Sequence, residues 1–72
     1  MTIDAIRDNI TSHMGNEISV IHNEGRNKIY EYEGKVVEVY NNIFIILDKK
    51  DARKKSFSYY DVLTEAVKVS FK

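Results

Sequence analysis

The last sixteen or so residues, Ser56–Phe71, restrict the fold more than any other part of this chain. They contain a short aromatic strand, one polar turn and a closing strand whose apolar residues alternate. We predict strands over 55–59 and 65–71, with a one-turn helical link over 60–64. Elements joined with so little slack are typical of a small β-barrel that closes on itself.

The beginning of the chain predicts an α-helix over 2–14. Four apolar residues follow a helical spacing along it: Ile3, Ile6, Ile10 and Met14. Thr2 is placed to cap the first turn, and Gly15 provides the left-handed residue that commonly ends a helix. A helix this short is marginal in water, so its apolar stripe must pack against the rest of the domain.

From Asn16 onward the apolar period changes from helical to alternating. A strand over 16–23 leads into a turn at 23–26, where Gly25 is expected to adopt positive φ. A long strand over 27–40 follows, and Gly34 inside it predicts a bulge or sharp bend. After a turn at 41–42, the wholly apolar run 43–47 predicts a strand buried on both faces.

Together these segments predict a mainly β protein, in which an N-terminal helix precedes a five-stranded antiparallel barrel of the SH3-like, Sm-like kind. A chain of 72 residues allows a single domain over 1–72, with the helix at 2–14 and the barrel over 16–71. Cysteine is absent and no signal-peptide pattern or 18-residue apolar run occurs, so we expect a cytoplasmic protein with no membrane span.

The charges cancel overall but are unevenly distributed. Eleven basic and eleven acidic residues give no net charge, which weakens the case for a dedicated nucleic-acid-binding protein. The segment 49–55 nevertheless contains five basic residues and one acidic residue. This basic loop could be a solvated connection, a track for RNA phosphates or a contact for an acidic protein, and the sequence leaves all three open.

No catalytic or metal-binding pattern is found in the sequence. His13 is explained by the helix dipole and His22 by its place at a strand end, and neither has a nucleophile and orienting group at a suitable spacing. The glutamates of the long strand lack compact ligand spacing. We therefore expect no enzyme activity, no catalytic residue, no metal and no cofactor.

Four residues are predicted to shape the backbone. Gly15, Gly25 and Gly34 serve the helix end, the first turn and the long strand. Asp61 lies just after two tyrosines and is predicted to cap the backbone N–H groups of the turn at 62–64.

The five tyrosines are many for so small a chain, and they suggest a contact surface. Barrels of this type bind single-stranded RNA by stacking bases on surface aromatics beside lysine and arginine. Tyrosines can equally fill the rim of a thin core with their hydroxyls in water. The candidate contact residues are Arg26, Lys28, Tyr30, Tyr32, Tyr59, Lys54 and Lys55.

Several segments resemble the Veg family of small cytosolic proteins of low-G+C Gram-positive bacteria. The most specific is Ser58-Tyr59-Tyr60-Asp61-Val62-Leu63-Thr64-Glu65, followed by the turn Gly25-Arg26-Asn27-Lys28. The other matching residues are Glu31, Gly34, Tyr40, Ile43-Phe44-Ile45-Ile46, Val67, Val69 and Phe71. The chain departs from the family pattern at Asn41-Asn42, where a proline-serine turn is usual, and in its shorter, more basic loop 49–55.

The resemblance implies a non-enzymatic regulatory protein that stimulates biofilm formation and affects transcription of matrix genes. The implied mode is action on another regulator, and no helix-turn-helix is evident in the sequence. The leading hypothesis is thus an interaction module whose partner is a transcriptional regulator. The alternative is an Sm-like domain that binds single-stranded RNA, and in either case a homodimer or small homo-oligomer is possible because sheet edges favour pairing.

Overall fold

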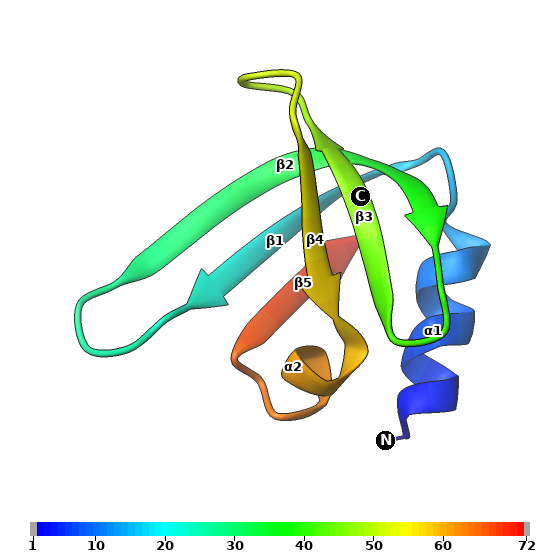
Figure 1. Cartoon of the computed structure of the whole chain (residues 1–72), viewed down its shortest axis with the longest axis horizontal. Helices are drawn as coiled ribbons and strands as arrows, with labels where there is room; N and C mark the ends of the chain where they lie inside the picture. Colours follow the sequence, from blue (N-terminus) through cyan, green and yellow to red (C-terminus); the bar gives the residue numbers. More distant parts are fainter. Residues whose placement is uncertain (1, 72) are drawn as a thin grey trace.

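The computed structural model describes residues 2–71, which form two helices and five strands (Figure 1). The helices are α1 (Ile3–Ser12) and α2 (Tyr59–Leu63). The strands are β1 (Glu17–Asn23), β2 (Ile29–Val39), β3 (Ile43–Asp48), β4 (Lys54–Ser58) and β5 (Val67–Phe71). The predicted types and order of the elements are confirmed.

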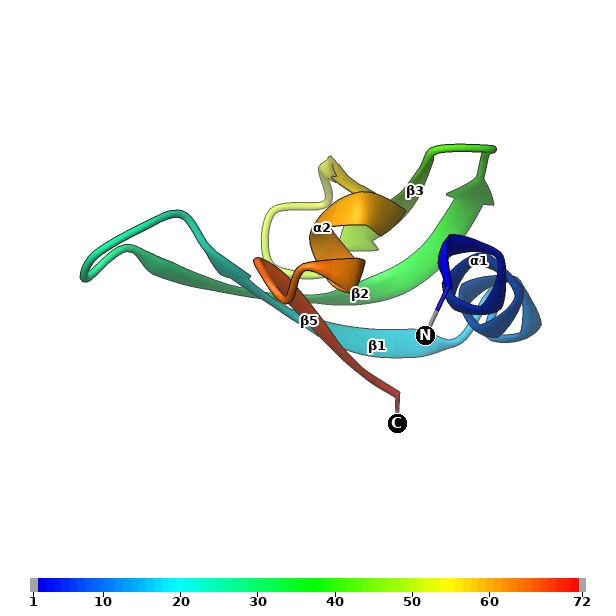
Figure 2. The same cartoon turned by 90° about the horizontal axis from the view of Figure 1, so that it is seen from below.

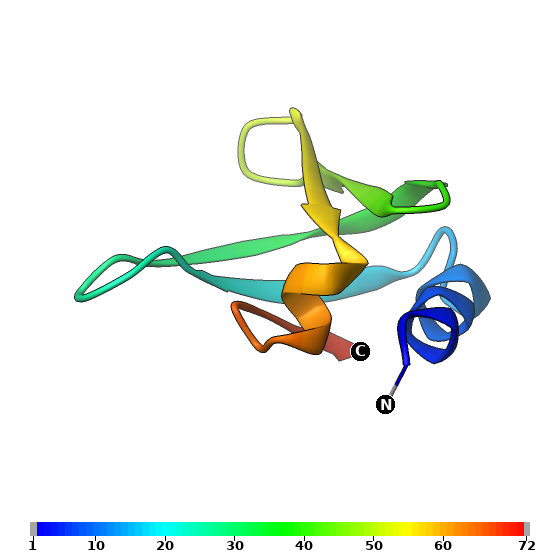
Figure 3. The same cartoon turned by 60° about the horizontal axis from the view of Figure 1, so that its bottom comes forward.

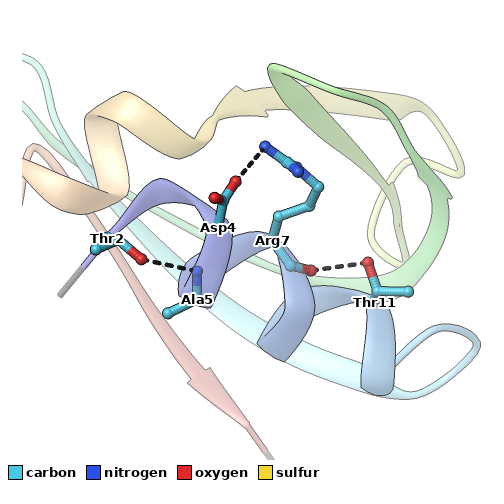
Figure 4. A network of polar contacts seen from close by, with 5 residues as sticks. All are labelled: Thr2, Asp4, Ala5, Arg7 and Thr11. Carbon is cyan, nitrogen blue, oxygen red and sulfur yellow. Dashed lines mark hydrogen bonds and ion pairs between the residues drawn. The ribbon is translucent and has the colours of Figure 1, made fainter.

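Helix α1 begins as predicted but ends earlier. The Thr2 hydroxyl accepts a hydrogen bond from the Ala5 N–H at 3.1 Å, as Figure 4 shows. Ile6 and Ile10 are buried, whereas Met14 is 46% exposed because the helix ends at Ser12. Gly15 has φ of +83°, which confirms the predicted left-handed residue after the helix.

All strands pair antiparallel in one sheet of order β4-β3-β2-β1-β5. The sheet is not closed into a barrel, because β4 and β5 form its two edges and do not pair with each other in the described chain. Between them lies α2, which packs against α1, β4 and β5 (Figures 2 and 3). The barrel closure predicted from the sequence is therefore not confirmed, since this short helix takes the place of direct edge pairing.

Strand β2 is long and curved, and its irregularity is displaced from the predicted position. The register shift against β3 lies between Val36 and Glu38, not at Gly34. Gly34 is needed for another reason, because a Cβ atom there would lie 2.1 Å from the backbone oxygen of Leu47. The glycine thus permits close approach of β2 to β3.

Strand β3 is buried on one face only, so the predicted burial on both faces is wrong. Phe44 and Ile46 are fully buried, whereas Leu47 is 39% exposed. The reason is that both helices pack on the same side of the sheet (Figure 2). The other side is left to the solvent, and apolar residues pointing there are only partly covered.

The core lies between the sheet and the helices. It combines α1 residues with inward-facing residues of every strand and with Tyr59 of α2. Its members are Ile6, Ile10, Ile18, Val20, Val36, Phe44, Ile46, Phe57, Tyr59 and Val67. The Phe44 ring lies 5.7 Å from the Phe57 ring and 5.6 Å from the Tyr59 ring, measured between centroids.

The residue that caps α2 is Ser58, so the prediction that Asp61 is the cap is wrong. The Ser58 hydroxyl accepts a hydrogen bond from the Asp61 N–H at 3.0 Å. The helix begins at Tyr59, one residue before the predicted link over 60–64, which places Asp61 inside the first turn. There its carboxylate lies near the positive end of the helix.

Candidate interaction surface

The hairpin that joins β1 to β2 projects away from the core, and residues 23–31 are all exposed. We call residues 23–30 the arm; it extends to the left in Figure 1 and contains no core residue. The paired strands continue into it, with Asn23 opposite Ile29 and His22 opposite Tyr30 at its base.

The tip of the arm has a defined conformation. The Asn23 side chain accepts a hydrogen bond from the Gly25 N–H at 3.0 Å. Two backbone hydrogen bonds close the turn. The Glu24 N–H donates to the Lys28 carbonyl oxygen at 2.8 Å, and the Lys28 N–H donates to the Gly25 carbonyl oxygen at 3.2 Å. Gly25 has φ of +135° and Asn27 has φ of +60°, so the positive φ predicted for Gly25 is confirmed.

The arm carries exposed apolar and exposed basic side chains. Ile29 is 63% exposed and Tyr30 is 45% exposed, and Arg26 and Lys28 are exposed beside them. Within residues 2–71 neither cation has an acidic side chain in ion-pair range. Three of the predicted contact residues, Arg26, Lys28 and Tyr30, therefore lie on the same exposed hairpin, in a position open to a partner.

Tyr32 marks the transition from the arm to the core. It is partly buried, its ring centroid lies 5.5 Å from that of Phe57, and the Lys55 ammonium lies 5.8 Å from its centroid. On the neighbouring strand, His22 lies edge-on to Phe57 and 3.6 Å from a carboxylate oxygen of Glu24. These contacts fix the base of the arm, and they leave only part of the Tyr32 ring for another molecule.

Tyr59 is not a surface residue, which corrects its prediction as a contact residue. Its side chain is fully buried, and its hydroxyl has no hydrogen-bond partner in the part of the chain that the structure describes. The guanidinium carbon of Arg7 lies 5.9 Å from its ring centroid. Arg7 is oriented by Asp4 at 3.0 Å (Figure 4). Burial raises the pKa of the Tyr59 phenol, while the charge of Arg7 and the Tyr40 backbone oppose this shift.

The lysines predicted as contacts on β4 are paired with acids of the same chain. Lys54 lies 3.0 Å from Glu38, and Lys55 lies 3.2 Å from Asp51. A hydrogen bond from the Tyr40 hydroxyl, together with Lys54, lowers the pKa of Glu38. Both lysines thus have structural partners, and they lie outside the arm.

The basic loop 49–55 is held by its own contacts. Lys49 lies 3.1 Å from Glu17 and 3.0 Å from Glu33, and hydrogen bonds to these carboxylates raise its pKa. Asp48, which is buried, accepts a hydrogen bond from the Lys50 N–H at 2.9 Å, and Asp51 accepts one from the Arg53 N–H at 3.0 Å. The loop is a fixed connection in which most charges have local partners.

Sequence reasoning missed two residues of this region. Ile29 was not singled out, although an isoleucine next to a glycine turn has little core to pack against. Lys49 was included only in the basic loop, and its two partners come from strands that are distant in sequence. Pairing of that kind is visible only once the strand register is known.

Two further observations concern the described chain as a whole. Within residues 2–71 no three histidine, aspartate or glutamate side chains gather closely enough to hold a metal ion. No helix in that range has the length and apolar character needed to cross a membrane.

Comparison with known proteins gives one family. The model of the family described as "Biofilm formation stimulator VEG" matches residues 1–70 of the 72-residue chain. No curated protein sequence matches this chain. The match spans the leader helix, the arm and the Ser58–Glu65 segment, which are the parts that carry the resemblance seen in the sequence. The chain therefore belongs to the VEG family of biofilm formation stimulators.

Proposed function

We propose that this chain is a non-enzymatic regulatory protein that promotes biofilm formation and modulates transcription by binding another regulator through the arm. Membership of the VEG family supports the role in biofilm formation. The single observation that supports the mode of action is the arm itself. It carries an exposed aliphatic residue on one face and an exposed aromatic residue on the other, well away from the core. Its two cations have no ion-pair partner within residues 2–71.

The chemistry of the arm favours a protein partner. Tyrosine and arginine anchor protein interfaces more often than other residues do, because they combine a large contact area with polar groups. Ile29 and Tyr30 point to opposite faces of the arm, because successive residues of a strand alternate. A partner that grips both faces would cover them, and Arg26 and Lys28 would face acidic groups around that contact. The ordered turn at the tip lowers the entropy that binding must overcome.

Binding of single-stranded RNA is supported less well. Stacking would need several exposed rings beside free cations. Tyr59 is buried, Tyr32 is partly covered, and Lys54 and Lys55 are paired with carboxylates. The arm alone offers one exposed tyrosine and two cations, which is a small footprint for a nucleic acid.

A regulatory role without catalysis is consistent with the surroundings of the two histidines. His13 Nδ1 donates to the Asn9 carbonyl oxygen at 2.8 Å, and the His13 ring stacks on Phe71. His22 lies beside Glu24 and Phe57. The Ser12 hydroxyl lies 3.2 Å from His13 Nδ1, but it donates its own hydrogen bond to the Asn9 carbonyl oxygen at 2.8 Å, so both groups close the end of α1. Each ring therefore has a structural explanation.

The proposal is tested by replacing both exposed arm residues, Ile29→Ser and Tyr30→Ser, in a biofilm-forming bacterium whose sole copy is this chain. We expect loss of biofilm mass and of matrix-gene transcription at unchanged protein level. Tyr60→Ser is the matched control, because Tyr60 is 62% exposed on α2 and lies outside the arm. Unchanged biofilm in the arm variant would contradict the proposal.

The RNA alternative is tested with the purified protein. Binding of single-stranded RNA is measured at low salt and then at increasing salt, because phosphate contacts weaken steeply as counterions are added. We expect no binding at low salt. Salt-sensitive binding that the arm substitutions Arg26→Ser and Lys28→Ser abolish would favour RNA over the protein partner.

A further inference from the structure

The C-terminal strand β5 leaves one edge of the sheet open. It pairs with β1 on one side only, and it stands at the end of the strand order. Its last described residue is ordered by a ring stack, since the Phe71 and His13 centroids lie 4.0 Å apart with the planes inclined by 21°. An ordered, unpaired edge is a template for a further strand.

The register identifies which backbone groups of β5 are free. The Asn23 N–H donates to the Ala66 carbonyl oxygen at 2.8 Å, so Ala66 faces β1. Because hydrogen-bonded residues alternate along an antiparallel pair, Lys68 and Ser70 also face β1. The N–H and C=O groups of Val67, Val69 and Phe71 therefore point away from the sheet.

An apolar groove accompanies this edge on the core side of the sheet. It has a volume of about 250 Å³ and is lined by residues of α1, α2 and β5. Figure 3 shows the arrangement of these three elements. Its lining consists of Ala5, Ile6, Asn9, Val62, Val69 and Phe71. A strand added to β5 would place its own inward side chains next to this groove.

We propose that β5 pairs with β5 of a second copy of this chain, antiparallel and centred on Val69. In this register Val69 lies opposite Val69 of the other copy, and Val67 lies opposite Phe71. All the outward backbone groups of the five-residue strand then find partners. Lys68 lies opposite Ser70, so no like charges face each other, and the inner row is wholly apolar.

The other edge of the sheet is a poorer candidate for self-pairing. Strand β4 carries Lys54 and Lys55, and lysine on an edge strand opposes pairing with another chain. Both lysines are also committed to carboxylates of their own chain. The self-complementary strand is β5, and the resulting dimer has one continuous sheet of ten strands, twice the five of one copy.

The register is tested by cysteine cross-linking, for which this chain is a clean background because it contains no cysteine. Lys68→Cys and Ser70→Cys proteins are mixed and oxidised. These two positions form a non-hydrogen-bonded pair in the proposed dimer, with Cα atoms about 4.5 Å apart, which suits a disulfide. We expect the mixed disulfide to form in preference to the disulfide between two copies of either variant.

A second measurement separates dimer formation from folding. In Val69→Pro the proline removes an N–H that faces away from β1, so the monomer loses no sheet hydrogen bond. Ser56→Pro is the matched control on the other edge strand. The Asp48 N–H donates to the Arg53 carbonyl oxygen, so Arg53 faces β3. Because the direction alternates along the strand, the Ser56 N–H points to the outer side of β4. Mass is measured by light scattering after size exclusion, and folding by circular dichroism.

The expected result is twice the chain mass for the native protein and for Ser56→Pro, and a folded species of single mass for Val69→Pro. Single mass for the native protein at millimolar concentration would overturn the proposal. So would a dimer that survives Val69→Pro, or cross-linking between Lys68→Cys copies as efficient as the mixed reaction, because each requires a different interface.

Discussion

At the residue scale, Tyr59 shows how one side chain can be read in two ways. Its position between Ser58 and Tyr60 suggests a surface aromatic, whereas the structure places it fully buried against Phe44. An aromatic residue that follows a strand faces the core or the solvent according to the turn that comes next. Here α2 begins at Tyr59 and directs its ring inward.

The buried hydroxyl of Tyr59 makes Tyr59→Phe a favourable change. The hydroxyl has no hydrogen-bond partner within residues 2–71, because the nearby Tyr40 N–H donates to the Ile43 carbonyl oxygen at 2.9 Å. Its removal should therefore raise the free energy of unfolding by about 1 kcal/mol. The pKa of the phenol is raised above 10.0, so the unfolded state ionises first and stability falls as pH rises past that value. Tyr59→Phe should reduce this alkaline loss.

Urea unfolding between neutral pH and about pH 11, a range that spans the ordinary tyrosine pKa, measures both effects. Tyr60→Phe is the control, because Tyr60 is 62% exposed and its hydroxyl is open to water. A Tyr59→Phe protein less stable than the native chain would show that the hydroxyl has a stabilising partner.

Gly34 allows a second prediction at this scale. A Cβ atom would meet the Leu47 backbone oxygen at 2.1 Å and its carbonyl carbon at 2.7 Å, and neither atom can move without separating β2 from β3. We expect Gly34→Ala to lower the free energy of unfolding by about 3 kcal/mol, the upper part of the range for overpacking.

Gly15→Ala is the matched control for Gly34→Ala. No atom lies within 4 Å of a Cβ atom at Gly15, so only its positive φ is strained and the cost should be about 1 kcal/mol. Equal thermal shifts for the two alanine variants would mean that the close approach of β2 and β3 relaxes freely.

At the scale of elements, the small helix α2 lies between the two edge strands, where a barrel would have paired them, and it directs Tyr59 into the core. It has five residues, too few to be stable alone, and depends on its cap and on packing. Ser58→Ala removes the hydroxyl that accepts the Asp61 N–H, and should lower the free energy of unfolding by about 1 kcal/mol.

Asp61→Ala distinguishes the two possible caps. No hydrogen bond to the Asp61 carboxylate is found in the described chain, so its loss should cost less than the loss of the Ser58 hydroxyl, about 0.5 kcal/mol through the helix dipole. Chemical denaturation of both variants measures the difference. A larger cost for Asp61→Ala would restore the aspartate as the cap.

Most elements of this fold could be predicted because local patterns specify them. The period of Ile6 and Ile10 identifies α1, and alternation identifies the strands. Barrel closure could not be predicted in the same way, since it depends on whether β4 and β5 meet across α2. The displaced bulge in β2 has the same origin, because register against β3 is a property of two strands.

At the scale of the whole molecule, the arm and the core are separate in composition and in contacts. Every core residue lies outside 23–30, while the exposed apolar and unpaired basic residues of the candidate interaction surface lie within it. The sequence indicated Arg26, Lys28 and Tyr30 through their types and proximity. It could not show that Tyr59, Lys54 and Lys55 are engaged elsewhere, because burial and ion pairs follow from the tertiary structure.

This separation predicts that the arm can be shortened without loss of the fold. His22 and Tyr30 lie opposite each other on the two strands. Two positions nearer the tip, the Glu24 N–H donates to the Lys28 carbonyl oxygen. Because hydrogen-bonded pairs recur at every second position, His22 and Tyr30 also form a hydrogen-bonded pair. Replacing residues 23–29 by Asn-Gly would connect that pair with a two-residue turn, the commonest hairpin connection. Because no core contact is removed, the melting temperature should change by only a few degrees, within the shift that about 1 kcal/mol produces in so small a domain.

The same variant should lose biofilm stimulation, since Arg26, Lys28 and Ile29 are all removed. Thermal unfolding and biofilm mass are measured on one protein, with the Tyr60→Ser variant as the control for an exposed residue outside the arm. A shortened protein that unfolds at a much lower temperature would show that the arm supports the core. A stable shortened protein that still stimulates biofilm formation would instead place the partner on another surface, and the open face of the sheet around Leu47 would then be the next surface to alter.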